Sequence, residues 1–262
     1  MRSIKKAKAF AIDMDGTFFL SNTLLPGGLE FLSLLNARNI PFSFLTNNSA
    51  KSPEDYRYKL MRFGVAEEDC RIYTSGDATI AFLNNHLPGK SVFLLGTESL
   101  ANQFTSAGIV LDEKNPEVAV LGYDTGLTYA RLTQFCDLVR LGLPYIATHP
   151  DVNCPVEKGF APDAGAFMAL IEASTGRKAD AVIGKPNPLM MTGLAERLGV
   201  DQHDMVMVGD RLYTDIAFGK TAGVGTVLVL SGETKPEDLQ GSVYQPDLVC
   251  ENLLELSEFL SK

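Results

Sequence analysis

Short apolar segments alternate with helix-forming segments along the whole chain, and this alternation limits the fold more than any other feature. Such an order is typical of the α/β class, in which helices join the strands of a parallel sheet. The apolar segments are nearly continuous, so we expect strands that are buried on both faces. The predicted strands are Lys8–Ile12, Pro41–Leu45, Arg71–Thr74, Ser91–Leu95, Glu117–Leu121, Pro144–Ala147, Ala181–Ile183, Met205–Val208 and Thr226–Leu230.

Local signals also mark where several helices begin and end. Ser52 is followed by a proline, which favours the first position of a helix. Thr97 and Thr128 are candidate N-caps, because a threonine hydroxyl can accept a hydrogen bond from the first turn. Apolar residues recur at helical spacing in Pro188–Leu198, and Gly199 is expected to end that helix.

The charge balance bears on the kind of partner that the chain can bind. The chain has 262 residues, of which 45% are hydrophobic, and its formal net charge is −9. That composition is typical of a globular protein with a sizeable core. A negative chain repels a phosphate backbone, so we expect no nucleic-acid polymer as a partner. A small molecule that carries a phosphate group remains compatible with this net charge.

Neither a membrane span nor a disulfide framework is expected. The longest segment without a charged side chain, Gly16–Leu29, is shorter than the ~18–20 apolar residues that a spanning helix needs. The basic residues near the start precede an apolar run that contains aspartates, which does not fit a signal peptide. The four cysteines form no CxxC pair, so we expect a reducing, cytoplasmic environment.

The segment FAIDMDGT, residues 10–17, carries the strongest chemical signal. A buried-type strand ends there in Asp13 and Asp15, which an extended chain would place on one side. Open α/β sheets bind their ligands at the carboxyl ends of the strands. Two neighbouring carboxylates repel one another unless a cation or a shared proton lies between them, so the pair indicates a metal site. An exposed Asp-Gly turn is the alternative interpretation.

Two further strand ends carry polar side chains suited to phosphate. In SFLTNNS, residues 43–49, Thr46, Asn47 and Asn48 offer donors to phosphate oxygens, although an ordinary turn would also favour them. In IGKPNP, residues 183–188, Lys185 precedes a proline that restricts its backbone. A lysine held in this way provides a fixed positive charge for a phosphoryl group or for carboxylates.

The fourth segment, MVMVGDRLYTD at residues 205–215, repeats the design of the first. Asp210 follows the predicted strand directly and can reach a metal ion. Asp215 is expected in the first turn of the next helix, where it serves either the site or the charge of the helix terminus. All four segments are strand ends of one predicted sheet, so together they indicate a single site.

In this order the four segments resemble the four motifs of the haloacid dehalogenase-like superfamily, in its phosphatase branch. The sequences of these and neighbouring segments are TNNS, VLGYDTGLTY, ATHPD and GKPNP. They are similar to those of NagD-type sugar and nucleotide phosphatases and of 4-nitrophenylphosphatases, which form subfamily IIA. The likeness covers nearly the whole chain. It implies a Rossmann-like, doubly wound core with an inserted α/β cap domain of the C2 type. The implied core is residues 1–80 and 182–262, and the implied cap is residues 81–181.

The resemblance also implies how the site is used. Asp13 would be the nucleophile that forms an aspartyl-phosphate, and Asp15 the general acid and base. Mg²⁺ would be held by Asp13, the backbone carbonyl of Asp15, and Asp210. Thr46, Asn47, Asn48 and Lys185 would hold the phosphate, with Asp215 orienting Lys185 or a metal-bound water. A cap loop from about His149 to Glu157 would read the leaving group, with Asp151, Asn153 and Cys154 among its contacts.

The expected activity is therefore Mg²⁺-dependent hydrolysis of a small phosphorylated metabolite, such as a sugar phosphate or a nucleoside monophosphate. A phosphotransferase would use the same phosphoaspartate, and a non-catalytic sensor of a phosphorylated metabolite is the alternative from another class. A dehalogenase is disfavoured because it needs no second acid at the position of Asp15. The resemblance leaves open a homodimer through the cap. A His149→Ala variant is expected to change substrate preference more than general hydrolysis.

Overall fold

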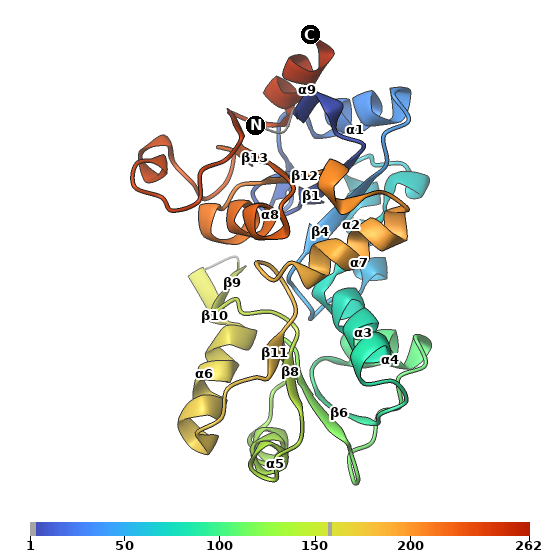
Figure 1. Cartoon of the computed structure of the whole chain (residues 1–262), viewed down its shortest axis with the longest axis vertical. Helices are drawn as coiled ribbons and strands as arrows, with labels where there is room; N and C mark the ends of the chain where they lie inside the picture. Colours follow the sequence, from blue (N-terminus) through green and yellow to red (C-terminus); the bar gives the residue numbers. More distant parts are fainter. Residues whose placement is uncertain (1–3, 157–158) are drawn as a thin grey trace. The chain divides into compact units, whose positions relative to one another are not determined.

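The computed structural model describes residues 4–156 and 159–262, and these form two compact units (Figure 1). The first unit comprises the chain up to Thr46, Asp55–Tyr73 and Lys185–Lys262. The second comprises Asn47–Glu54 and Thr74–Gly184, and so contains the predicted cap segment. Residues 47–54, 74–80 and 182–184 group with this second unit, although the sequence analysis assigned them to the core. Residues 1–3 and 157–158, which the predicted core and cap include, lie outside the described residues.

The first unit is built on a six-stranded sheet in the order β14-β13-β12-β1-β4-β5. The strands are β1 (Ala9–Asp13), β4 (Phe42–Thr46), β5 (Ile72–Thr74), β12 (Met205–Gly209), β13 (Gly225–Val229) and β14 (Leu248–Cys250). Strands β14 to β4 pair in parallel with their neighbours, and the central strand β1 lies between β12 and β4. Since β1, β4 and β12 are parallel, their carboxyl ends lie at one edge of the sheet.

Helices cover both faces of this sheet. The helices of the first unit are α1 (Gly28–Ala37), α2 (Pro53–Arg62), α7 (Leu189–Leu198), α8 (Ala217–Ala222) and α9 (Leu253–Ser261). Phe10 and Ile12 of β1 share a buried cluster with α1, α2 and α9. Alternate residues of a strand face opposite sides, and α8 packs on the other face beside Met207 and Thr226. The sheet is therefore doubly wound.

The second unit contains a four-stranded parallel sheet in the order β11-β8-β7-β6. Its strands are β6 (Val92–Leu95), β7 (Val118–Leu121), β8 (Tyr145–Ala147) and β11 (Ala181–Val182), and its helices are α3 (Ser75–His86), α4 (Glu98–Ser106), α5 (Tyr129–Arg140) and α6 (Ala164–Thr175). Helices α5 and α6 cover one face, where Phe135 and Ile171 pack against Phe93 and Tyr145. An antiparallel hairpin, β9 (Asn153–Val156) and β10 (Gly159–Pro162), precedes α6.

The predicted α/β class is confirmed, and each of the nine predicted strands is present within about two residues of its predicted ends. Thr97 and Thr128 cap α4 and α5, and Gly199 follows the last residue of α7. The sequence analysis missed β14, the hairpin β9–β10 and a short hairpin of β2 (Phe19–Leu20) with β3 (Thr23–Leu24). In residues 4–156 and 159–262, every helix falls short of the length and apolar character that crossing a bilayer requires.

Candidate functional site

Two aspartates of the first unit lie at the ends of neighbouring strands. Asp13 is the last residue of β1, and Asp210 follows β12 directly. The register pairs Ile12 with Val208, so both carboxylates lie at the same edge of the sheet. Asp13, Asp210 and Asp215 each place a carboxylate oxygen within 4.8 Å of the other two. Asp13 thus forms one carboxylate cluster with two acids that lie about 200 residues later in the sequence.

A buried lysine joins two members of the carboxylate cluster. The ammonium of Lys185 donates to Asp13 Oδ1 at 2.5 Å and to Asp215 Oδ1 at 2.7 Å. The Lys185 side chain is 3% exposed, and that of Asp215 is 1% exposed. The structure therefore brings together Asp13, Lys185, Asp210 and Asp215, which the sequence analysis selected from three separate segments.

The electrostatics of the cluster favour the binding of additional positive charge. With all groups ionised, three carboxylates and one ammonium leave a net charge of −2. Burial raises the pKa of Asp13 above its ordinary value, and Asp215 adds to this rise while Lys185 opposes it. Burial and the charge of Asp215 raise the pKa of Asp210 to about 7. Burial lowers the pKa of Lys185, but the two carboxylates more than offset this and hold it above its ordinary value.

The two oxygens of Asp210 have different surroundings, and the difference fits a cation ligand. Oδ2 accepts a hydrogen bond from the backbone N–H of Glu233 at 2.7 Å. Oδ1 is buried and has no hydrogen-bond partner among the described residues. A buried carboxylate oxygen is costly without a partner, and a hard divalent cation is a partner that prefers oxygen. By contrast, Asp215 accepts from Lys185 at Oδ1 and from the Arg211 N–H at Oδ2, 3.1 Å away.

Backbone of two tight loops packs against Asp210. Gly16 has a φ of 91°, and a Cβ there would lie 2.3 Å from Asp210 Oδ2. A Cβ on Gly232 would lie 2.0 Å from the same oxygen, and Ser231 donates to the carbonyl of Gly16 at 2.9 Å. The sequence analysis missed the loop that contains Ser231 and Gly232. A signal was present, because both small residues follow a predicted strand at the same edge of the sheet.

Asp15 and Thr46 are the other predicted site residues in the first unit. The Asp15 side chain is exposed and is not part of the carboxylate cluster. Thr46 is buried at the end of β4, one residue beyond Leu45, which pairs with Asp13. Asp215 lies in a π-helical turn, Leu212–Ile216, rather than in the first turn of a regular helix as predicted.

The second unit contains the other predicted site residues, and several of them interact. Asn47 donates to Asp151 Oδ1 at 3.1 Å, and its carbonyl accepts from the Ser75 hydroxyl at 2.5 Å. The amide of Asn48 lies 3.8 Å from Cys154 Sγ. Asn153, the first residue of β9, is exposed. These residues connect the TNNS segment to the loop that begins at His149.

His149 is completely buried within the second unit. Its Nε2 lies 2.9 Å from Asp163 Oδ1, and its Nδ1 lies 2.9 Å from the Thr148 hydroxyl. Both ring nitrogens therefore have protein partners. A contact between His149 and a substrate stays a prediction, and the sequence analysis did not select Asp163.

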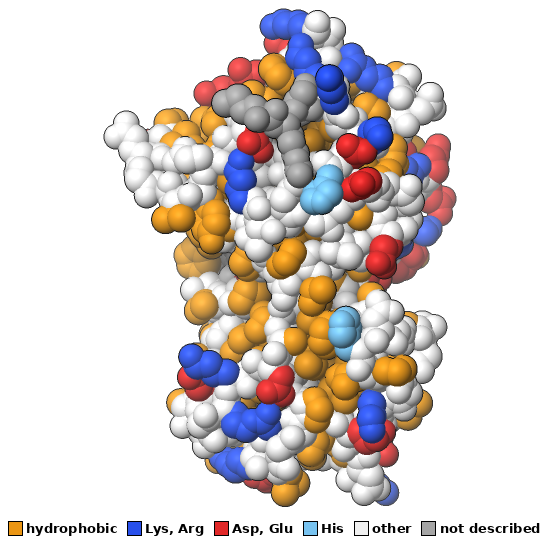
Figure 2. Space-filling model, in the orientation of Figure 1, with side chains coloured by type: hydrophobic (Ala, Val, Ile, Leu, Met, Phe, Trp, Pro, Cys, Tyr) orange, Lys and Arg blue, Asp and Glu red, His pale blue; other side chains and the backbone are white. Residues whose placement is uncertain are grey.

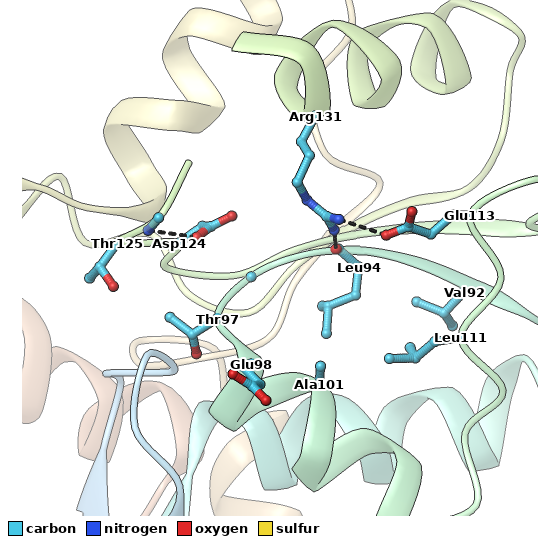
Figure 3. Close-up of a pocket in the computed structure, with 12 residues that line it drawn as sticks. Val92, Leu94, Thr97, Glu98, Ala101, Leu111, Glu113, Asp124, Thr125 and Arg131 are labelled. Carbon is cyan, nitrogen blue, oxygen red and sulfur yellow. Dashed lines mark hydrogen bonds and ion pairs between the residues drawn. The ribbon is translucent and has the colours of Figure 1, made fainter. Parts of the chain in front are cut away.

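A cavity of about 470 Å³ lies beside β6 in the second unit. Its walls include Leu94 and Leu111, and the Arg131 guanidinium donates to Glu113 and to the Leu94 carbonyl, each at 2.6 Å (Figure 3). The residues that line it include none of the predicted site residues.

The surface charges of the described residues are mixed. On the face drawn in Figure 2, lysine and arginine side chains lie among acidic and neutral ones and do not gather into a continuous basic surface. Pairs such as Lys90 with Glu117 and Arg140 with Asp137 bring opposite charges together in the second unit. The absence of a nucleic-acid partner stays a prediction.

The chain matches known proteins over nearly its whole length. A model of haloacid dehalogenase-like hydrolases matches residues 10–110, and a HAD-hydrolase-like model matches residues 182–256. An acid sugar phosphatase of Staphylococcus saprophyticus is 36% identical over 260 residues, which are 99% of this chain and 100% of the relative. The chain belongs to the haloacid dehalogenase-like hydrolases.

Two solved structures place this haloacid dehalogenase-like hydrolase more closely. A 4-nitrophenylphosphatase from Thermotoga maritima is 50% identical, with a TM-score of 0.93 over 97% of both chains. A structure described as a putative NagD protein is 47% identical, with a TM-score of 0.92 over 98% of this chain and 100% of its own. The predicted NagD-type membership of subfamily IIA is confirmed, and the chain is an enzyme of the phosphatase branch. Hydrolases of this family generally use Mg²⁺, and the carboxylate cluster is an acidic group suited to a cation.

Proposed function

We propose that the enzyme hydrolyses phosphomonoesters of small metabolites through a phosphoaspartate on Asp13, with Mg²⁺ bound beside it. The observation that carries this proposal is the buried cluster in which one lysine bridges Asp13 and Asp215 while Asp210 keeps an unpartnered oxygen. A structural ion pair would need no third acid with an unsatisfied oxygen. Preorganised charged groups around the phosphoryl group are the main source of catalysis in phosphoryl transfer, because they stabilise the transition state.

In the first step, a carboxylate oxygen of Asp13 attacks phosphorus and the bond to the ester oxygen breaks. Asp15 gives its proton to the departing alkoxide, which leaves as an alcohol. In the second step, Asp15 takes a proton from water while the water oxygen attacks phosphorus. The bond between phosphorus and Asp13 then breaks, which releases inorganic phosphate and restores both carboxyl groups. The exposed position of Asp15 suits contact with leaving groups of different shapes.

Lys185, Thr46 and Asn47 serve the phosphoryl group that all substrates share. The ammonium of Lys185, 2.5 Å from Asp13, holds the nucleophile and offers positive charge to phosphoryl oxygens. Thr46 follows the residue that pairs with Asp13, so it ends β4 at the same edge of the sheet as the nucleophile. Asp215 orients Lys185 through the 2.7 Å hydrogen bond.

The residues present fit a divalent cation. Asp13, Asp210 and the backbone carbonyl of Asp15 would hold Mg²⁺, since both oxygens of Asp215 already accept hydrogen bonds. When bound, Mg²⁺ supplies positive charge that offsets the net charge of the cluster and of the phosphate. Asp210 is fixed for this role through its other oxygen by the N–H of Glu233.

The second unit acts as the cap that reads the leaving group. Its loop from His149 to Cys154, with the exposed Asn153, carries the polar side chains for that purpose. The named activities of the relatives, on sugar phosphates and 4-nitrophenyl phosphate, support small organic phosphates as substrates. We also propose that two copies of the chain form a homodimer through this unit, and we assign no surface to that contact.

The test compares the wild type with Asp13→Asn and Asp15→Asn on 4-nitrophenyl phosphate and on an alkyl phosphate, with Mg²⁺ and with EDTA. Asp13→Asn should abolish turnover of both. Asp15→Asn should slow the alkyl phosphate by about 10²–10⁴-fold, because an alkoxide needs the general acid. It should slow formation of the phosphoenzyme from 4-nitrophenyl phosphate far less, because 4-nitrophenolate leaves without a proton. Phosphorylated Asp15→Asn protein should then accumulate, detected by intact mass.

A Glu251→Gln variant is a suitable control, because it removes an exposed acid at the start of α9 and should keep wild-type rates. Equal nonzero rates in the wild type and Asp13→Asn would reject the covalent mechanism. No turnover of any phosphoester by the wild type would favour the sensor instead.

A further inference from the structure

A chain of buried hydrogen bonds runs through the second unit from α6 to the segment after β4. Asp163, the N-cap of α6, contacts His149 Nε2, and His149 Nδ1 contacts the Thr148 hydroxyl. That hydroxyl lies 3.1 Å from the Ser49 hydroxyl, which accepts from the Tyr123 N–H at 2.9 Å. We call Asp163, His149, Thr148 and Ser49 the histidine network. All four side chains are buried.

The arrangement does not favour a second metal site, although His149, Asp151 and Asp163 lie close enough to hold an ion. Both nitrogens of His149 have protein partners. Asp163 Oδ1 accepts from His149 and from the Ala164 N–H at 2.6 Å. Asp151 Oδ1 accepts from the Asn47 amide. Both ring nitrogens of His149 and one oxygen of each aspartate are thus already engaged in hydrogen bonds.

The histidine network is located where the chain passes between the two units. Asn47 is joined by a peptide bond to Thr46, and Gly184 is joined to Lys185. Gly184 packs against the network, because its N–H donates to the Thr148 carbonyl at 2.7 Å. Asn47 precedes Ser49 of the network by two residues. A Cβ on Gly184 would lie 2.6 Å from His149 Cβ and 2.7 Å from Asn47 Oδ1. Gly184, His149 and Asn47 are therefore tightly packed, and the imidazole of His149 is linked through the Thr148 hydroxyl to Ser49, next to the first crossing.

We infer that His149 is a positioning residue, which holds Asn47 and Gly184 at a fixed spacing and thereby holds the phosphate-binding residues Thr46 and Lys185 that adjoin them. This inference rests on the proposed function, since it assigns those residues to the phosphoryl group. Each crossing residue is one peptide unit from its neighbour, and that distance is about 3.8 Å between Cα atoms. A shift of the crossings would therefore move the groups that bind phosphate, which every substrate shares.

This role makes a different prediction from direct contact with substrate. Loss of a positioning residue for the phosphate groups should affect all phosphomonoesters by one common factor. Loss of a contact with the leaving group should affect substrates unequally and leave inorganic phosphate binding unchanged. The first pattern is the opposite of the sequence-based expectation that His149→Ala changes substrate preference, so one experiment decides between the two.

The experiment measures kcat/KM for 4-nitrophenyl phosphate, glucose 6-phosphate and AMP, and titrates inorganic phosphate by calorimetry in the presence of Mg²⁺. His149→Ala and Ser49→Ala should each lower kcat/KM by a common factor of about five to ten, the effect of one net hydrogen bond. The dissociation constant of phosphate should rise by a similar factor. His149→Gln, which can still reach Asp163, should recover part of the loss. Ser49→Ala breaks the network without changing the histidine and so covers the case in which His149→Ala does not fold.

His86→Gln is the control, because His86 ends α3 in the same unit, is exposed and stacks on Phe82 outside the network. It should match the wild type. Factors that differ between substrates, or variants whose phosphate affinity is unchanged, would overturn the inference while turnover by the wild type upholds the proposed function. A wild type that neither turns over nor binds inorganic phosphate would overturn both.

Discussion

Replacing Lys185 by methionine removes the positive charge from between two buried carboxylates while keeping a side chain of similar length. The lysine makes hydrogen bonds of 2.5 and 2.7 Å to Asp13 and Asp215. Its side chain is 3% exposed, so water cannot replace the lost bonds without a rearrangement of the site. The variant should therefore be less stable as well as inactive.

The size of the loss follows from this burial. Breaking a buried ion pair by removing one partner costs about 3–5 kcal/mol, because it leaves an uncompensated buried charge. Lys220→Met is the matched control, since Lys220 also lies 2.7 Å from an aspartate, Asp247, but its side chain is 32% exposed. A partly exposed pair contributes roughly 1 kcal/mol or less. The two variants remove the same chemical group, and they differ in that Lys185 is buried and bridges two carboxylates, whereas Lys220 is partly exposed and pairs with one.

The assay is thermal unfolding followed by circular dichroism, in EDTA and at neutral pH. Lys185→Met should lower the Tm by roughly 10 °C, given about 2–4 °C per kcal/mol for a domain of this size. Combining it with Asp13→Asn and Asp215→Asn removes the stranded charges and should restore about half of the lost stability. The reasoning is refuted if Lys185→Met is no less stable than Lys220→Met, or if the triple variant is less stable than Lys185→Met alone.

Two other substitutions test the surroundings of the first unit. Gly232→Ala adds a Cβ that would lie 2.0 Å from Asp210 Oδ2, so it should displace this carboxylate and weaken Mg²⁺ binding by about tenfold or more. If calorimetry gives an affinity for Mg²⁺ equal to that of the wild type, the proposed ligand role of Asp210 is contradicted. Asp247→Asn tests acid stability: although burial opposes the shift, hydrogen bonds lower the pKa of Asp247 in the folded chain. The ionised Asp247 carboxylate stabilises the folded chain above the pKa that it has in the unfolded chain, and this stabilisation is lost as the pH falls through its pKa in the folded chain. Between about pH 5 and pH 3, the free energy of unfolding in urea should therefore fall less for the variant than for the wild type.

The strands and the order of the site segments could be predicted from the sequence because their signals are local. A buried strand such as Ala9–Asp13 needs a continuous apolar run, and a cap such as Thr97 needs only its own hydroxyl and the next turn. The elements that were missed lack such signals. Strand β14 is short and partly exposed, and the hairpin β9–β10 contains prolines and a glycine.

The site was predicted in part for the same reason. Asp13, Lys185 and Asp210 each follow a recognisable strand, and the rule that ligands bind at strand ends selects them. Asp163 has no comparable signal, since an aspartate before a helix is an ordinary N-cap. Its partner His149 looked exposed to substrate in the sequence, and only the fold shows that both ring nitrogens have protein partners.

By itself, the sequence determined the α/β class, the strands and the family, because hydrophobic patterning, turn residues and motif wording depend on neighbours along the chain. The tertiary structure decided which charges meet and how deeply they are buried. Hydrogen bonds such as Lys185 to Asp13, between residues 172 positions apart, depend on how the strands are ordered in the sheet. Burial, and with it the raised pKa of Asp210, depends on every element packed around the group, which no local pattern encodes.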